Sequence, residues 1–408
     1  MRIALPGNAA FTGYWIAETL LTFGQEIFSV AVGWQIYELT GSALSLGLIG
    51  LTQFLPLFLL ALPAGHIADN FDRRHITIVC QLIKFAGLGM LATASFAGAV
   101  PIWMIYACTF AFGISHAFQQ PALRALMPTL VTRAELPQCI AWTVGAKKAA
   151  TIAGPALGGL IYLLGAVAAY GAGALCFIAA GILLARIRLT QGSVPTREPM
   201  TMDSLFGGIA FIRQRPVILG AMSLDLFAVL LGGATALLPI YARDVLEIGP
   251  SGLGLLRAAP AAGAVFVSLL LMRFRLERHV GRKLFASIAV FGVATIVFGL
   301  SHSAALSFAA LAVLGGADMV SMVIRQSLVQ LQTPEGMRGR VGAVNSVFTG
   351  TSNQLGQFQS GVAAAWLGAV SAVAIGGAGT LLVAALWIWW FPALWKSDRF
   401  VTRDDEGK

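Results

Sequence analysis

Charged side chains are scarce in this sequence. Of its 408 residues, 11% are Asp, Glu, Lys or Arg and 57% are hydrophobic, whereas a typical soluble protein carries about 25% charge. This scarcity excludes a water-soluble surface over most of the chain. Apolar runs of roughly 20 residues, the length that crosses a bilayer, make up most of the sequence. We therefore predict an all-α membrane protein.

Cysteine is scarce too, and the common catalytic motifs are absent. The four cysteines, Cys80, Cys108, Cys139 and Cys176, lie in different apolar runs, without CxxC spacing or nearby histidine ligands. We interpret them as small packing residues and predict neither a metal site nor a disulfide. The sequence has no nucleophile–base motif and no phosphate-binding P-loop. We therefore expect no enzyme, no ATP-driven pump and no cofactor.

The apolar runs predict twelve transmembrane helices. They are continuous and lack the alternation that is typical of barrel strands. The first run is too long for a signal peptide and carries two acids, so we interpret it as a span. The expected spans are 11–37, 43–68, 75–98, 101–128, 136–164, 166–187, 216–242, 252–273, 282–301, 305–331, 341–367 and 370–394.

The basic residues are distributed unequally between the two sets of links. Most of the 27 Lys and Arg lie at the termini and in the links that follow even-numbered spans, and Arg243 alone lies in an opposite link. The positive-inside rule then places both termini in the cytoplasm. The net charge of +9 is explained by this topology, so we expect no nucleic-acid partner.

One long polar interval divides the chain into two halves. It predicts an N-terminal six-helix bundle (1–187), a cytoplasmic linker (188–215), a C-terminal six-helix bundle (216–395) and a cytoplasmic tail (396–408). A weak internal repeat supports two pseudo-symmetric bundles and sets Glu18 opposite Asp225. The matched segments are Leu46-Gly47 with Leu253-Gly254, Arg73-Arg74 with Arg282-Lys283, and Arg124 with Arg325.

A short charged link joins the second and third spans. It reads Gly65-His-Ile-Ala-Asp69-Asn-Phe-Asp72-Arg73-Arg74 and resembles the same loop of major facilitator transporters, with Asn70 and Asp72 as departures. An ordinary positive-inside turn would explain the arginines but not the glycine and the acid four residues later. The resemblance implies a gating motif made of Gly65, Asp69, Arg73 and Arg74. We expect the glycine to permit close helix approach.

The corresponding link of the second half differs. It keeps Gly281-Arg282-Lys283, but Arg278 stands where the acid would be. The two halves are therefore not equivalent at this link.

Two further stretches narrow the resemblance. Glu26 follows a glycine in the first span, and a Thr-Gly-Ser turn (40–42) precedes the second. Residues 120–128 read Gln-Pro-Ala-Leu-Arg-Ala-Leu-Met-Pro. Both stretches are similar to the bacterial efflux branch that includes siderophore (enterobactin) exporters and macrolide efflux proteins. The resemblance implies a secondary transporter with the major facilitator fold.

The fifth span contains a glycine-rich motif. Its residues Gly154, Pro155, Gly158 and Gly159 resemble the end of the motif that marks proton-linked antiporters. Ala141 and Ala150 stand where that motif has its earlier glycines. The alternative is plain helix packing, because small residues and a proline kink also allow close contact.

Ionisable residues inside the spans are candidates for the transport path, because charge is costly in hydrocarbon. Our proton-coupling candidates are Glu26, Asp225 and Glu18. Several candidates have a structural alternative. Glu18 could lie at the cytoplasmic rim, Arg124 and Arg325 could snorkel from helix ends or clamp the loops beneath them, and Asp318 and Arg325 could form a structural pair or link other helices. His116 could be a packing residue, and Lys84 could snorkel to the surface. The cavity-polar candidates are His116, Gln120, Arg124, Arg257, Asp318, Arg325, Asn353 and Gln357.

We therefore expect a multi-pass protein of the bacterial inner membrane that acts as a monomer. It would export a bulky amphipathic molecule, a siderophore or drug-like compound, in exchange for protons. Its partners would be the small-molecule substrate, protons and the lipid bilayer. Two alternatives stay open: a lysophospholipid flippase of the same fold, and a non-transporting membrane receptor or scaffold.

Overall fold

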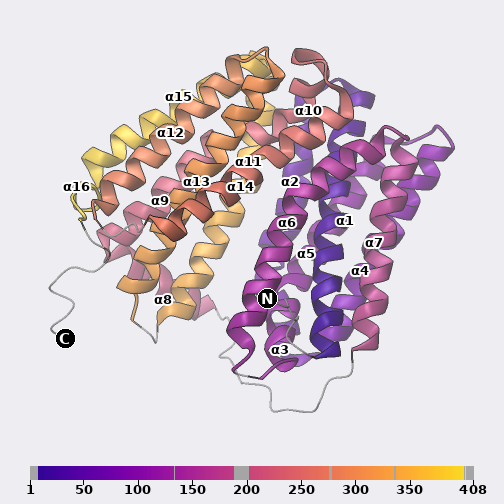
Figure 1. Cartoon of the computed structure of the whole chain (residues 1–408), viewed down its shortest axis with the longest axis horizontal. Helices are drawn as coiled ribbons and strands as arrows, with labels where there is room; N and C mark the ends of the chain where they lie inside the picture. The colour runs from indigo at the N-terminus through magenta and orange to yellow at the C-terminus, as the bar shows by residue number, and fades with distance from the viewer. Residues whose placement is uncertain are drawn as a thin grey trace. The chain divides into compact units, whose positions relative to one another are not determined.

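The computed structural model describes residues 8–132, 134–187, 202–274, 278–334, 337–398 and 400. Every regular element in this part of the chain is helical (Figure 1). The longer helices are α1 (Ala9–Thr40), α2 (Ala43–Leu59), α3 (Ala61–Asn70), α4 (Arg73–Phe96), α5 (Ile102–Leu126), α6 (Leu136–Tyr162), α7 (Ala166–Arg186), α8 (Met202–Arg213), α9 (Pro216–Leu231), α11 (Gly249–Arg273), α12 (Val280–Leu300), α13 (Ala304–Gln332), α14 (Arg338–Leu367) and α15 (Ala369–Trp390). The short helices are α10 (Leu238–Ile240) and α16 (Pro392–Trp395).

The expected spans all fall on helices, and two of them are interrupted. The second span divides into α2 and α3 at Leu60, because Pro63 has no N–H to donate to the carbonyl of Leu59. The seventh span ends as a regular helix at Leu231 and continues to Val245 in short turns. Seven described segments are long and apolar enough to cross a membrane, and one of them is the whole of Pro216–Val245.

Glycine accounts for the break after α9. A Cβ at Gly232 would lie 2.6 Å from the ring of Phe291, and one at Gly233 would lie 2.7 Å from the carbonyl oxygen of Gly356. Neither position can hold a larger side chain without displacing its neighbours. The regular helix α9 therefore ends where the chain is in close contact with α12 and α14.

The linker contains a helix that the sequence analysis did not predict. Residues Met202–Arg213 form α8, within the interval that we expected to be a polar linker. The helix packs against α14 and α9. Residues 188–201 of the predicted linker lie outside the described residues.

The contacts divide the chain into two compact units. Unit 1 comprises Met1–Gly41, Thr52–Pro199 and Ile248–Ala258, and unit 2 comprises Ser42–Leu51, Met200–Glu247 and Ala259–Lys408. In unit 1, α1 packs against α6 and α7, and α4 packs against α5 and α7. In unit 2, α12 lies between α13 and α15 (Figure 1). Helices α2 and α11 each contribute one segment to either unit.

Paired glycines anchor these two exchanged segments. In unit 2, a Cβ at Gly361 would lie 2.5 Å from the Cα of Gly47. In unit 1, a Cβ at Gly254 would lie 3.1 Å from the Cα of Gly159. Gly47 and Gly254 are the glycines that the sequence repeat matches. The two halves therefore use the repeated Leu-Gly pair for the same purpose, backbone contact with a second helix.

The tail folds back onto the start of α12. The carboxylate of Asp398 accepts a hydrogen bond from the backbone N–H of His279 at 3.0 Å, and the N–H of Gly281 donates to the carbonyl of Ser397 at 2.9 Å. A Cβ at Gly281 would lie 1.9 Å from the carbonyl oxygen of Leu394. The second charged link thus obtains its acid from the tail. Residues 401–408 of the predicted tail lie outside the described residues.

Candidate functional site

Glu26 lies where α1 and α6 approach most closely. Its side chain is half-buried in unit 1. A Cβ at Gly154 would lie 2.7 Å from the Cβ of Glu26, and one at Gly158 would lie 3.0 Å from the Cα of Ile27. Two glycines of the antiporter-like motif therefore face the segment of α1 that carries the acid. A larger residue at position 154 would displace the Cβ and Cγ of Glu26.

Arg257 lies beside this acid in unit 1. Its guanidinium donates a hydrogen bond to the hydroxyl of Ser29, one turn after Glu26 on α1. It is also close enough to Glu26 for the two charges to interact. The Nε of Arg257 is buried without a hydrogen-bond partner among the described residues. A buried cation held in this way depends on the nearby carboxylate for compensation.

Gly159, the last glycine of the motif, allows α11 to contact α6 near Arg257. A Cβ at Gly159 would lie 2.4 Å from the carbonyl oxygen of Pro250, and one at Gly254 would lie 2.3 Å from that of Pro155. The backbones of α6 and α11 are thus in direct contact one turn before Arg257.

The glycine at position 154 permits a sharp prediction. Gly154→Ala should destabilise the protein by about 1–3 kcal/mol, the usual cost of overpacking, and should impair proton coupling because Glu26 must move. Gly145→Ala is the matched control on α6, since a Cβ there meets nothing within 4 Å. Thermal unfolding and proton-linked flux are the measurements. Equal behaviour of the two variants would contradict the close contact with Glu26.

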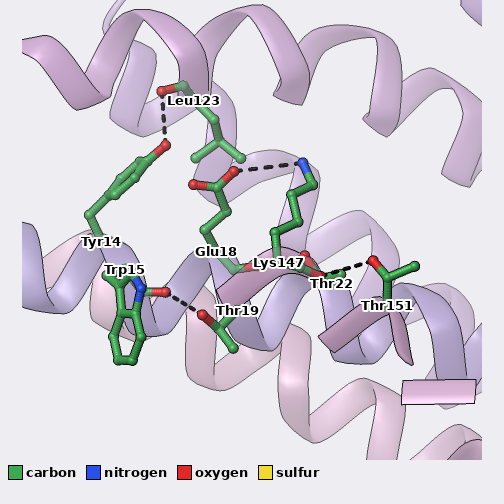
Figure 2. Close-up of polar contacts among 8 residues, drawn as sticks. All are labelled: Tyr14, Trp15, Glu18, Thr19, Thr22, Leu123, Lys147 and Thr151. Atoms are coloured by element: carbon green, nitrogen blue, oxygen red, sulfur yellow. Dashed lines mark hydrogen bonds and ion pairs between the residues drawn. The ribbon is translucent and has the colours of Figure 1, made fainter. Parts of the chain in front are cut away.

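Glu18 is paired with a lysine of α6. Figure 2 shows its carboxylate and the ammonium of Lys147 pointing toward one another, with Nζ and Oε1 3.7 Å apart. The hydroxyl of Tyr14, one turn earlier, donates to the carbonyl of Leu123 at 3.3 Å (Figure 2). The Lys147 side chain is 45% exposed. Glu18 therefore has a partly solvated partner, unlike the buried arginine beside Glu26.

Asp225 forms a buried ion pair in unit 2. Its carboxylate contacts the guanidinium of Arg325, and both side chains are less than a tenth exposed. The Nε of Arg325 has no hydrogen-bond partner among the described residues. Of the two alternatives for Arg325, a pair with Asp318 or a link to another helix, the structure shows the link, through a carboxylate on α9. Helices α9 and α13 are joined by this pair.

The structural alternative for Lys84, snorkelling to the surface, is wrong. Its side chain is only 2% exposed, and its ammonium donates to Oε1 of Gln119 at 2.7 Å. The rings of Phe112 and Phe177 lie 5.7 and 5.2 Å from the ammonium. The lysine is therefore an internal polar group of unit 1. Its position in an apolar run was the only sequence signal.

The other cavity-polar candidates lie on α5, α13 and α14. His116 and Gln120 are half-buried on α5, and Arg124 is exposed at its end. Asn353 is exposed on α14 and donates to the carbonyl of Thr349 at 3.0 Å. Gln357 is half-buried against Gly50, whose added Cβ would lie 2.8 Å away. Asp318 is half-buried on α13.

The arginines of the first charged link bind helix ends. Arg73 donates to the carbonyls of Ala68 on α3 and Ala125 on α5, at 3.3 and 3.2 Å. Arg74 donates to the carbonyl of Ile187, just after α7, at 2.7 Å. Cations are favourable at the negative ends of helices. The two arginines therefore tie three helix ends to the start of α4.

The expected role of Gly65 is wrong for this conformation. A Cβ there would meet nothing within 4 Å, so the glycine does not serve a close helix contact. The start of α4 is capped by Asp72, whose carboxylate accepts from the N–H of Arg74 at 2.8 Å. The side chain of Asp69 lies outside the described residues.

The cysteines and other soft ligands are dispersed. All four cysteines are free thiols. In the part of the chain that the structure describes, no group of three or more His, Cys, Asp or Glu could hold a metal ion.

Solved structures with a similar fold cover nearly the whole chain. They include a bacterial homolog of the human lysosomal transporter Spinster (TM-score 0.72, 14% identity, 95% of each chain) and the nucleoside transporter NupG (TM-score 0.72, 13% identity, 95% of this chain and 99% of that one). The POT family transporter PepTSo has a TM-score of 0.75 at 12% identity, covering 96% of this chain and 99% of that one. These likenesses show that the chain has the fold of these membrane transporters.

The family follows from the sequence match. Residues 5–403 match the profile of the transmembrane secretion effector family, and the chain belongs to that family. Macrolide efflux protein A of Streptococcus pyogenes is 26% identical over 302 residues, 71% of this chain and 73% of that protein. The enterobactin exporter EntS of Shigella boydii serotype 18 is 26% identical over 384 residues, 94% of this chain and 92% of that protein. The predicted family resemblance is confirmed.

Proposed function

We propose that this transporter exports a bulky amphipathic small molecule across the bacterial inner membrane in exchange for protons. Its relatives that carry macrolides and enterobactin support the substrate class. The observation that supports proton coupling is the position of Arg257, which contacts Ser29 and interacts with the charge of Glu26. This arrangement gives one titratable carboxylate a direct influence on a buried cation of another helix.

The proposed mechanism uses the protonation state of Glu26. The ionised carboxylate compensates the charge of Arg257. It therefore favours the state in which Arg257 of α11 keeps its hydrogen bond to Ser29 of α1. Protonation removes that compensation and leaves the buried guanidinium with a neutral hydroxyl partner, which is unfavourable. The state in which Arg257 is released then gains population. Proton binding drives transport only through such a difference between states.

Alternating access would follow from exchange of the shared segments. In this mechanism the two predicted six-helix bundles, 1–187 and 216–395, move relative to each other. Residues 42–51 and 248–258 would change partners during the cycle, because each clusters with the opposite half of the chain. The contacts of Gly47 and Gly254 are the ones that would open.

Flux in everted membrane vesicles tests the function. Vesicles that contain the protein should accumulate a siderophore, macrolide or dye when their interior is made acidic. A protonophore should stop this accumulation. Transport of lysophospholipid without a gradient would favour a flippase. No saturable flux of any compound would favour a receptor or scaffold. Either result would reject the proposal.

Cysteine labelling tests the proposed orientation. In a background without the four native cysteines, an impermeant external reagent should miss positions near Asn70, Arg197 and Arg278, because the positive-inside rule places them in the cytoplasm. External labelling at Arg197 would contradict this orientation and place both termini outside the cytoplasm. The positions that should react are near Gly41, Gly98, Gly165, Glu247 and Ser303.

The first charged link is proposed to hold the cytoplasmic side closed. Asp69→Asn should preserve membrane insertion but lower export and increase cytoplasmic accessibility, because the amide has no charge to pair with Arg73 or with the positive N-terminal end of a helix. Arg278→Gln should have a smaller effect, because Arg278 itself stands where the acid of the first link would be. Wild-type flux in Asp69→Asn would remove the gate and leave the link as a topology signal.

A further inference from the structure

A lateral groove lies in unit 2 between α11, α12 and α13. Its volume is about 670 Å³. Its wall carries Phe266, Val290 and Val313, whose side chains are 64%, 45% and 51% exposed. Val290 and Val313 lie well inside helices that are long and apolar enough to span the membrane. These exposed apolar side chains therefore lie at the level of the hydrocarbon core.

Small residues make the groove deep. A Cβ at Gly263 would lie 1.8 Å from the carbonyl oxygen of Ala312, and one at Gly316 would lie 2.7 Å from the side chain of Val267. These contacts hold α11 close to α13 and leave no side chain to fill the floor beside α12. Gly316 and Ala317, which form part of the floor, are buried. The hollow is thus a consequence of the sequence at the α11–α13 contact.

Lys283 is the single basic residue of the lining. It lies in the first turn of α12 and is half-buried. Its ammonium has no ion pair or hydrogen bond with another residue in the described ranges. The other polar group of the lining, the hydroxyl of Ser287, donates to the carbonyl of Leu284 at 2.7 Å. The cation is therefore the one polar group of the groove that is available to a ligand.

We propose that this groove binds an anionic phospholipid, with one acyl chain along α12 and the phosphate on Lys283. The lining residues Lys283 to Val290 follow two turns of α12, about 10 Å at 1.5 Å per residue. A basic side chain at the end of an apolar path between helices is the arrangement that holds an anionic lipid headgroup. In the proposed orientation, this lipid belongs to the cytoplasmic leaflet.

The alternatives have a poorer fit to the lining. A water-soluble anion would leave the long apolar wall uncovered. A zwitterionic lipid would give Lys283 no net countercharge. A second copy of the chain would bury Val290 and Val313 but would need to neutralise the same lysine. An anionic lipid would cover the apolar wall with its acyl chain and neutralise Lys283 with its phosphate.

Native mass spectrometry of the full-length protein tests the proposal with phosphatidylglycerol as the probe. The wild type should retain one phosphatidylglycerol at concentrations where phosphatidylcholine with the same acyl chains does not bind. Lys283→Gln should raise the concentration for half occupancy about fivefold, because one basic residue contributes about 1 kcal/mol and 1.4 kcal/mol is tenfold. Arg282→Gln, one residue earlier and outside the lining, should bind as the wild type does.

A second variant tests the apolar part of the groove. Ala286→Trp keeps the lysine but fills the hollow, so it should abolish retention of the lipid; Val297→Trp, elsewhere on α12, should not. Inorganic phosphate should not compete. Equal losses in Lys283→Gln and Arg282→Gln, or unchanged binding in Ala286→Trp, would indicate annular lipid only and overturn the proposal. A dimer without retained lipid would assign the groove to a second copy of the chain and also overturn it.

Discussion

Glu26→Gln should abolish proton-driven uphill export while substrate binding is retained. Gln keeps the size of the side chain and its packing against Gly154, but it cannot bind and release a proton. Arg257 then has a permanently neutral neighbour, so the proton gradient no longer distinguishes the two states of the transporter. Losing a coupling free energy of about 1.4 kcal/mol or more removes a bias of about tenfold or more between the two states, so no uphill export should remain. Downhill exchange should persist.

The matched control for this variant is on the same helix. Glu38 is exposed near the end of α1, where its carboxylate accepts a hydrogen bond from Tyr162 at 3.3 Å. Glu38→Gln makes the same chemical change away from Arg257 and should leave coupling intact. The measurement is substrate-induced proton movement in proteoliposomes at imposed pH gradients. Unchanged coupling in Glu26→Gln would mean that Glu26 only hydrogen-bonds a neighbouring helix.

The sequence predicted the helices because burial in lipid requires long apolar runs, and those runs are visible without an alignment. It did not predict the interruption at Leu60 or the turns after Leu231. Pro63 and the Gly232-Gly233 pair are the local causes, but proline and glycine are tolerated in many transmembrane helices. Their effect depends on the neighbouring helices. The helix in the linker was missed because we interpreted that interval from its polar residues.

The candidate site was predicted as separate residues and not as a cluster. Glu26 and Arg257 were each selected because charge is costly in hydrocarbon. Their proximity depends on glycine contacts between α6 and α11, which no single-sequence pattern specifies. The same reason explains the missed role of Asp398, which reaches His279 only because the tail folds back. Lys84 was selected as an ionisable residue, but its burial depends on how α4 packs against α5 and α7.

The buried pair of Asp225 and Arg325 permits a prediction about stability. Asp225→Asn removes the countercharge and leaves a guanidinium that is buried and short of hydrogen-bond partners. Breaking a buried pair in this way typically costs about 3–5 kcal/mol, so the variant should unfold at a markedly lower temperature in detergent. An Asp225→Leu, Arg325→Met double variant should recover most of that stability, because no charge remains to be compensated.

An exposed ion pair provides the control for this experiment. Arg243 and Asp244 lie 3.8 Å apart with side chains 41% and 48% exposed, so Asp244→Asn should cost about 1 kcal/mol or less. Stability and proton coupling should be measured in every variant, since Asp225 is also a coupling candidate. A fully stable Asp225→Asn protein that has lost proton coupling would assign Asp225 to proton transfer and reject a structural pair. A destabilised single variant and a stable, coupled double variant would instead leave Glu26 as the residue through which the gradient acts.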